Sequence, residues 1–287
     1  MKIIGSYTFN IVAAASVLLS IATSLIGSIN VFKKQSLVGD AIGHASYPGI
    51  IIAFMVSKSR SPFILLTGAA LLGGAAYHLI QKSEKRTTIP LDGNLAIFLS
   101  GFFGLGMVLK TYIQGNARFA RASQAGLDAY IFGQTSFLLE LDLVMIAIVT
   151  LVCVLFFTLF YKEIKLYLFD REFSAVIGLP TKLMDALILV MTILVISVGL
   201  KSVGALLISS FLILPVIAAE QWSDKFFNVL VISCIMSMTS SLIGNYLSFA
   251  GEGVATGPVI VLISCIFAFL SMMFGKRSHI FGKRRES

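Results

Sequence analysis

The sequence predicts an all-α, polytopic membrane protein with eight or nine transmembrane helices, on three observations. Of its 287 residues, 57% are hydrophobic and only 13% are charged, which is about half the charged fraction of typical soluble domains. Apolar runs of about 20 residues, the length of a membrane-spanning helix, recur along the chain. The runs are continuous, whereas strands of a membrane barrel alternate apolar and polar residues. Because a backbone in lipid must satisfy its own hydrogen bonds, these runs are predicted to be helices.

Nine apolar segments follow one another and form a single transmembrane domain, residues 1–287. They cover residues 8–32, 37–57, 62–81, 93–113, 141–161, 183–200, 203–220, 226–248 and 257–274. The sixth and seventh segments are short and are separated only by Lys201 and Ser202. One long broken helix, and hence eight spans, is therefore the alternative. Residues 114–140 are predicted to form a short amphipathic or re-entrant element at the membrane interface.

The basic residues indicate how the chain is oriented. The net charge is +8, and Lys and Arg gather in residues 82–88 (KSEKRTT), in residues 162–171 (KEIKLYLFDR) and in the C-terminal tail. With nine spans these regions share one face, which the positive-inside bias makes cytoplasmic, and the N-terminus lies outside. The charge is therefore interpreted as a membrane-topology signal and not as a nucleic-acid surface.

One cytoplasmic loop ends in a short helix that presents apolar side chains. In residues 166–180, LYLFDREFSAVIGLP, Phe173, Val176 and Ile177 share one helix face. Asp170 or a neighbour caps the start, and the Gly-Leu-Pro that follows ends the helix. Such a helix fits the groove of another protein, and an ordinary amphipathic loop helix is the alternative. The chain has no GxxxxGK[ST] phosphate loop, so any ATP-driven motor must be another polypeptide, and the chain is not expected to be an enzyme.

The stretch SLVGDAIGHASYPGI, residues 36–50, places two ionisable residues inside the second predicted span. Asp40 and His44 are four residues apart and share one helix face. A charge in lipid costs at least about 2.5–3.5 kcal/mol on insertion scales, so such residues face a cavity or a partner. Three roles fit the spacing: the pair holds helices together, relays protons, or binds a divalent metal through a carboxylate and an imidazole. Two ligands are too few for a tight metal site, whereas a dimer axis would supply four.

These stretches resemble the permease subunits of the bacterial manganese, zinc and iron importers, the ABC-3 family. The family signature, approximately S-L-x-G-D-A-x-S-H-A-x-L-P-G, is matched from Ser36 to Gly49, with departures at Gly43 and Tyr47. Further family elements are matched in the same order by LDAYIFGQ (127–134), FDREFSAVIGLP (169–180), VGALLISSFLILPVIAA (203–219) and ATGPVIVL (255–262). The matches extend over nearly the whole chain, so together they are far more specific than any single one.

The resemblance implies the transmembrane subunit of an ATP-binding-cassette importer in the bacterial cell membrane. Its cargo would be a divalent manganese, zinc or iron ion, and no cofactor would be bound permanently. The absence of Cys and Met next to Asp40 places manganese before zinc and iron. The implied partners are two copies of a cytoplasmic ATPase subunit, an extracellular or periplasmic metal-binding protein, a second copy of this chain and membrane lipid, but no nucleic acid.

The resemblance also assigns roles to individual residues. Asp40 and His44 occupy the positions of the expected metal site. The coupling loop, at about 162–181, is expected to contact the ATPase through Phe169, Asp170, Glu172, Ala175 and Gly178. Apart from the resemblance, three residues that bend or loosen helices are expected to take part in gating: Pro48, Gly49 and Pro215.

Two other functions remain as alternatives. A permease for chelated iron or a cobalamin-like ligand would share the motor but would not need Asp40 and His44 as direct ligands. A secondary metal transporter would work without an ATPase. A membrane metalloenzyme would need further ligands and an acid-base carboxylate, and neither H-E-x-x-H nor G-x-S-x-G is present in the sequence.

Overall fold

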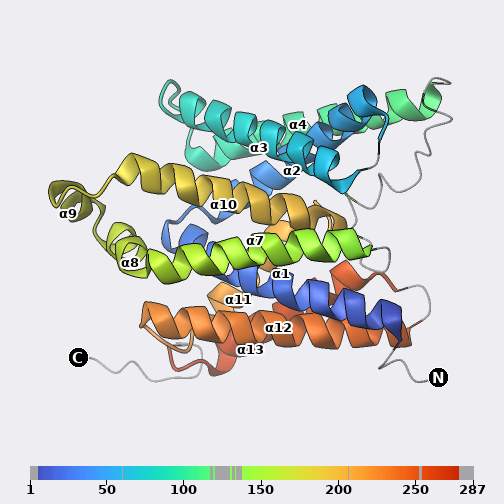
Figure 1. The fold of residues 1–287 in the computed structure, drawn as a ribbon. Helices are drawn as coiled ribbons and strands as arrows, with labels where there is room; N and C mark the ends of the chain where they lie inside the picture. The colour runs from blue at the N-terminus through green and yellow to red at the C-terminus, as the bar shows by residue number, and fades with distance from the viewer. Residues whose placement is uncertain are drawn as a thin grey trace.

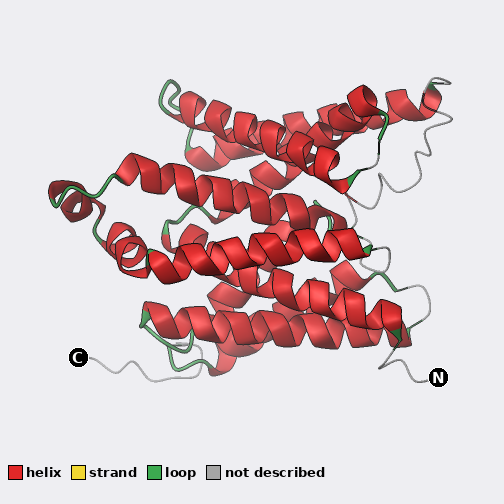
Figure 2. Cartoon of the chain, viewed as in Figure 1, coloured by secondary structure: helices red, strands yellow, loops and turns green. Residues whose placement is uncertain are grey.

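The computed structural model describes residues 6–59, 61–116, 119, 130, 133, 138–205, 207–251 and 254–277. Within these ranges the chain is helical and has no strand (Figure 1, Figure 2). Eight of the described helices are long and apolar enough to cross a membrane: α1 (Tyr7–Phe32), α2 (Ser36–Ser57), α3 (Pro62–Glu84), α4 (Leu91–Gly115), α7 (Glu140–Leu159), α10 (Thr181–Ser202), α12 (Phe226–Ala250) and α13 (Thr256–Phe274). The described part of the chain also contains the shorter helices α8 (Tyr161–Phe169), α9 (Arg171–Val176) and α11 (Ile208–Glu220). The prediction of an all-α, multi-pass membrane protein is confirmed.

The seventh predicted span, residues 203–220, is too short to be a full membrane crossing. Its helix α11 has 13 residues, whereas a bilayer requires about 20. Gly204 lies between α10 and α11 with a φ of +94°, a left-handed conformation that glycine adopts without the steric cost of a Cβ. Eight of the described helices are therefore full-length spans, and the seventh predicted segment forms a shorter apolar helix. The interfacial element predicted at 114–140 lies largely outside the described residues.

Contacts between helix termini define two ends of the helix bundle. At one end, the Tyr7 hydroxyl donates to Glu140, which joins the starts of α1 and α7. At the same end, Lys201 near the end of α10 pairs with Asp142 of α7.

The opposite end brings together the last residues of α1 and the first residues of α10 and α12. Lys33 pairs with Asp185 in α10, and the ring of Phe32 packs edge-on against Phe226. The backbone N–H of Arg277, just beyond α13, donates to the carbonyl of Gln221, just beyond α11. Helix α11 therefore runs back toward this end and does not extend α10 as one broken helix.

Basic residues identify this second end as the cytoplasmic one. Helices α8 and α9 lie there, and α9 projects beyond the other helices (Figure 1). Most of the described Lys and Arg side chains belong to segments at this end: Lys33, Lys34, Lys82, Lys85, Arg86, Lys162, Lys165, Arg171, Lys182, Lys225, Lys276 and Arg277. By the positive-inside bias this end is predicted to face the cytoplasm and the start of α1 to face outside.

Helix α2 is the most buried of the eight spans, because glycines let its neighbours approach. A Cβ added at Gly49 would lie 2.3 Å from the carbonyl oxygen of Gly68 in α3, so α2 and α3 cross with their backbones in contact. On another side, Gly39 and Gly43 face Ile196 of α10. Small residues are typical of such close crossings in membranes, where shape and not the hydrophobic effect selects the partner.

A ladder of buried serines joins α1 to α12 on the far side of α1. Ser16, Ser20, Ser24 and Ser28 recur every four residues on one face of α1 and are buried. The Ser20 and Ser241 hydroxyls are 2.6 Å apart. Hydrogen bonds between helices help to hold membrane helices together, because lipid offers polar groups no partner. This ladder fixes α1, the helix that precedes the α2 site, against the rest of the bundle.

Candidate functional site

Helix α2 presents Asp40 and His44 to α4 and α11. The His44 Nε2 and the Asp40 Oδ1 are 3.6 Å apart, which is too long for a hydrogen bond between them. The Asp40 Oδ1 instead accepts a 2.9 Å hydrogen bond from the hydroxyl of Ser209, near the start of α11. The carboxylate is therefore held by another helix and not by its neighbour in the predicted pair.

The imidazole of His44 is buried and is left with an unused nitrogen. Its side chain is 7% exposed, and its ring meets Phe103 of α4 edge-on at 5.2 Å between centroids. Among the described residues, the His44 Nδ1 has no hydrogen-bond partner. A buried polar atom without a partner costs about 1–3 kcal/mol. A bound ligand or metal ion that the nitrogen contacts is one explanation for a buried histidine nitrogen without a protein partner.

The two departures from the family signature have local packing reasons. A Cβ at Gly43 would lie 3.3 Å from the Ile208 Cγ2 and 3.5 Å from the carbonyl oxygen of Ala205, so glycine suits the close approach of the α10–α11 connection. Tyr47 is fully buried. Its ring packs against Gly106 of α4, where an added Cβ would lie only 2.5 Å from the Tyr47 Cδ1. Both departures keep α2 tightly packed around Asp40 and His44.

The chemistry offered by one chain is one carboxylate and one imidazole. The Asp40 side chain is 26% exposed, so one side of the pair is open. Within the ranges that the structure describes, no group of three or more His, Cys, Asp or Glu side chains is placed to hold a metal. A divalent ion held here would need its remaining ligands from water or from a second chain.

The residues expected in gating lie within helices, and one of them lies at a close helix crossing. Pro48 lies within α2, one turn after His44, and Gly49 forms the crossing with α3 described above. Pro215 lies within α11 and is buried. Their part in gating remains a prediction.

The coupling loop forms two helices, α8 and α9, where the sequence predicted one. The Asp170 carboxylate accepts the backbone N–H of Phe173 at 2.9 Å and caps α9, as predicted. Gly178 has a φ of +87° and follows the end of α9. The other three residues expected at the ATPase contact, Phe169, Glu172 and Ala175, are exposed. The structure places this surface at the cytoplasmic end and the Asp40–His44 pair within α2, so the two sites are separate.

The α9 surface carries apolar side chains that nothing in the described chain covers. Phe173 is 51% exposed and Val176 is 83% exposed. Ile177, the third member of the predicted face, is also exposed. Since α9 lies outside the spanning helices (Figure 1), these side chains are candidates for a protein contact and not for a lipid contact.

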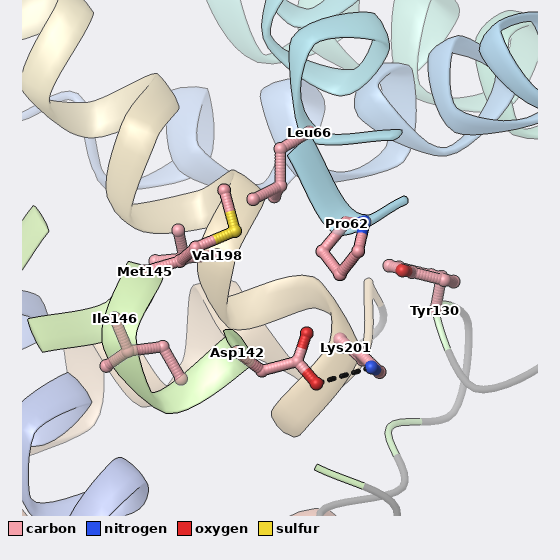
Figure 3. Close-up of a pocket in the computed structure, with 8 residues that line it drawn as sticks. All are labelled: Pro62, Leu66, Tyr130, Asp142, Met145, Ile146, Val198 and Lys201. Atoms are coloured by element: carbon pink, nitrogen blue, oxygen red, sulfur yellow. Dashed lines mark hydrogen bonds and ion pairs between the residues drawn. The ribbon is translucent and has the colours of Figure 1, made fainter. Parts of the chain in front are cut away.

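Sequence reasoning missed two ion-pair clusters at the ends of α10. At the cytoplasmic end, Asp185 contacts Lys33, Tyr167 and Arg171. At the outer end, Lys201 contacts Asp142. Figure 3 shows the outer pair beside a cavity of about 10 Å³, enough for about one water molecule, with Tyr130 and Met145 among its lining residues. Charged residues within apolar segments were the available signal for both clusters.

Comparison with known proteins gives the same assignment along almost the whole chain. A family profile described as the ABC 3 transport family matches residues 6–275. The zinc transport system membrane protein TroC of Treponema pallidum is 36% identical over 275 residues, with 96% of this chain and 91% of that protein covered. The manganese transport system membrane protein MntC of Bacillus subtilis is 35% identical over 263 residues, with 91% of this chain covered. The chain spans 60% of the length of that Bacillus protein.

A solved structure shares the fold. PsaBC from Streptococcus pneumoniae, determined in complex with Fab, includes a chain that superposes with a TM-score of 0.85 at 24% sequence identity. The superposition covers 97% of this chain and 95% of that chain. The arrangement of helices described above is therefore that of a known membrane protein fold.

Proposed function

Because the chain belongs to the ABC 3 transport family, we propose that it is the membrane-spanning subunit of an ATP-binding-cassette importer for a divalent transition metal. The cargo is manganese or zinc, the two metals named in the relatives TroC and MntC. Asp40 and His44 supply a carboxylate and an imidazole without a thiolate, and carboxylate ligands suit manganese. We therefore place manganese first.

The unpartnered, buried imidazole of His44 beside Asp40 is the observation that carries this proposal. A purely structural pair would use its polar atoms on each other or on neighbours. Here the two side chains are 3.6 Å apart, and the His44 Nδ1 is unused among the described residues. A second copy of the chain would bring the site to two carboxylates and two imidazoles. The site binds its ion loosely, because conduction requires release as well as binding.

The remaining partners follow from where the exposed surfaces lie. In the dimer, two copies of a cytoplasmic ATPase subunit dock, one on the α9 of each chain, through the side chains around Phe173 and Val176. A metal-binding protein delivers the ion at the outer end, where α1 and α7 begin. ATP binding by the partner moves α9, and the spans then expose Asp40 to the other side of the membrane.

The test is uptake of manganese and of zinc by cells that depend on this permease. Asp40→Asn and His44→Ala are compared with the wild type at equal protein levels in the membrane. We expect uptake of at least one metal to fall to background in both variants, because each removes one direct ligand.

Two control variants separate ligation from a general loss of charge or of histidine. His78→Ala removes an exposed histidine of α3, and Asp224→Asn removes an exposed carboxylate at the cytoplasmic end. Both should transport like the wild type. Uptake that persists in Asp40→Asn and His44→Ala would show that the pair is structural, and the proposed metal path would be wrong.

A further inference from the structure

Asp185, in the second turn of α10, collects side chains from three other segments. Its Oδ1 accepts a 2.9 Å hydrogen bond from the Nζ of Lys33, the residue that ends α1. The same oxygen accepts the hydroxyl of Tyr167 in α8. Its Oδ2 pairs with the guanidinium of Arg171, the first residue of α9. One carboxylate thus joins α10 to α1, α8 and α9.

This cluster is built around a buried aromatic ring. Tyr167 is 2% exposed, and both cations lie against its ring, with the Nζ of Lys33 at 5.3 Å and the guanidinium carbon of Arg171 at 5.5 Å from the centroid. The Lys33 side chain is 11% exposed, whereas the Arg171 side chain is 62% exposed. Lys33, Tyr167 and Asp185 therefore form the buried part of the cluster, and Arg171 is its exposed link to α9.

Two routes lead from Asp185 to the Asp40–His44 pair. The first passes through Lys33 and the short turn after it, in which Lys34 has a φ of +57°, to the first turn of α2 and Asp40. The second runs along α10 to Ile196, about 16 Å away at 1.5 Å per helical residue. The Ile196 side chain packs against α2 at Gly39 and Gly43, which lie beside Asp40 and His44.

The space between the cluster and α2 is not completely filled. A cavity of about 10 Å³ lies there, lined by residues that include Asn30, Gln35, Val38 and Asp185. The Nδ2 of Asn30 is buried and has no partner in the part of the chain that the structure describes. The α1–α2 turn is therefore not locked against α10 by packing alone, and the ion pairs of Asp185 set their relative positions.

We infer that Asp185 is the positioning residue that transmits movement of α9 to the metal pair in α2. This inference rests on the proposed function, since it takes α9 as the contact for the ATPase. Displacement of α9 pulls Arg171 against Asp185. Asp185 in turn moves α10 and, through Lys33, the start of α2. The ion pairs add no affinity for the metal. They couple ATP hydrolysis to metal uptake.

The test uses the complete complex of this chain with its ATPase, reconstituted in lipid vesicles with the metal-binding protein. ATP hydrolysis and manganese uptake are measured on the same vesicles, and the ratio of uptake to hydrolysis is compared between variants. In Arg171→Ala we expect hydrolysis to stay within about twofold of the wild type and the ratio to fall by about tenfold. Arg171→Lys retains a cation and should recover most of the ratio. Asp185→Asn should resemble Arg171→Ala.

A matched control is the pair of Arg277 with Asp224, 2.7 Å apart, at the same end of the molecule. Arg277→Ala removes an exposed arginine from an ion pair that does not involve α9, and its ratio should equal that of the wild type. An unchanged ratio in Arg171→Ala would overturn the inference. Loss of the ATPase from the purified Arg171→Ala complex would also overturn it, because Arg171 would then be a docking residue only.

The wild-type complex distinguishes failure of this inference from failure of the proposed function. A wild-type complex that hydrolyses ATP but imports neither manganese nor zinc would overturn the proposed function, and the inference with it. A wild-type complex that imports manganese beside an Arg171→Ala complex with the same ratio would overturn the inference alone. Arg171 is exposed and its removal buries no new charge, so the result does not depend on whether Asp185→Asn folds.

Discussion

The Ser209 hydroxyl donates a 2.9 Å hydrogen bond to the Asp40 carboxylate, and this bond connects the short helix α11 to the Asp40–His44 pair in α2. Ser209 lies directly after the irregular backbone around Gly204. The orientation of the proposed metal ligand therefore depends on α11, a helix too short to be a full membrane span. Groups that orient a ligand in this way are nearly as important to metal affinity as the ligands themselves.

Ser209→Ala is expected to weaken metal uptake without removing it. Loss of the hydroxyl leaves the Asp40 carboxylate free to rotate away from His44, and loss of such a partner typically costs 10–100-fold in affinity or activity. We expect the KM for manganese uptake to rise by about tenfold, measured in cells with equal amounts of protein. Ser209→Thr keeps the hydroxyl and should restore uptake. Ser264→Ala removes a hydroxyl that, among the described residues, bonds to the carbonyl of Ile260 in its own helix, and an equal effect there would contradict the prediction.

Gly49→Ala is expected to destabilise the protein, whereas Gly101→Ala is not. A methyl group on Gly49 would lie 2.3 Å from the carbonyl oxygen of Gly68, so α2 and α3 must separate. Overpacking of this kind costs about 1–3 kcal/mol. In the described part of the chain, nothing lies within 4 Å of a Cβ at Gly101 in α4, and alanine there gains up to about 1 kcal/mol in helix propensity. Thermal unfolding of the purified proteins measures the difference, and equal unfolding temperatures for the two variants would refute it.

The sequence predicted the helices well because their signal is local. Each of the nine apolar segments contains a helix, since the length and hydrophobicity that mark a segment also stabilise it in lipid. The predicted length of the seventh span was wrong, and the reason is also local. Residues 203–220 are apolar enough for a span, but Gly204 adopts a left-handed conformation that hydropathy does not report.

The candidate site was only half predictable. Asp40 and His44 were found from their spacing and from the cost of charge in lipid. Their actual partners, Ser209 and Phe103, are 169 and 59 residues away along the chain, and a serine or a phenylalanine in an apolar run is common. Asp185 carried the same signal as Asp40, a charge inside a span, but its partners come from three other segments and appear only in the folded chain.

Lys201→Met is expected to destabilise the outer end of the helix bundle. Asp142 is 7% exposed and Lys201 is 18% exposed, and their pair lies at the junction of α7 and α10 (Figure 3). Removal of one partner of a buried pair leaves an uncompensated charge and costs about 3–5 kcal/mol. The double variant Lys201→Met with Asp142→Asn should recover part of this loss. Thermal unfolding in detergent measures both effects, and a double variant less stable than Lys201→Met would argue against charge burial as the cause.

Val176→Asp is expected to release the ATPase subunit. Val176 is 83% exposed on α9, and a carboxylate in the centre of an apolar contact must be desolvated without a partner. We expect the ATPase to be lost when the tagged permease is purified from membranes, while the permease itself remains at the wild-type level. Val254→Asp, in the outer loop before α13, is the control, because the cytoplasmic ATPase does not reach that face. Retention of the ATPase by Val176→Asp would remove α9 from the docking surface.

The stability that Tyr167 contributes is expected to disappear at alkaline pH. Burial, and then the hydrogen bond to Asp185, raise the pKa of the Tyr167 hydroxyl. A raised pKa favours the protonated form in the folded state. The stabilisation is therefore fully present below the unfolded pKa of about 10 and is lost as the pH rises above it. The difference in unfolding temperature between the wild type and Tyr167→Phe should accordingly be largest near neutral pH and should shrink toward about pH 11. Melting followed by helical circular dichroism measures it, with Tyr246→Phe, which changes a half-exposed tyrosine of α12, as the control. A difference that stays constant across this range would show that Tyr167 contributes through packing of its ring and not through its hydroxyl.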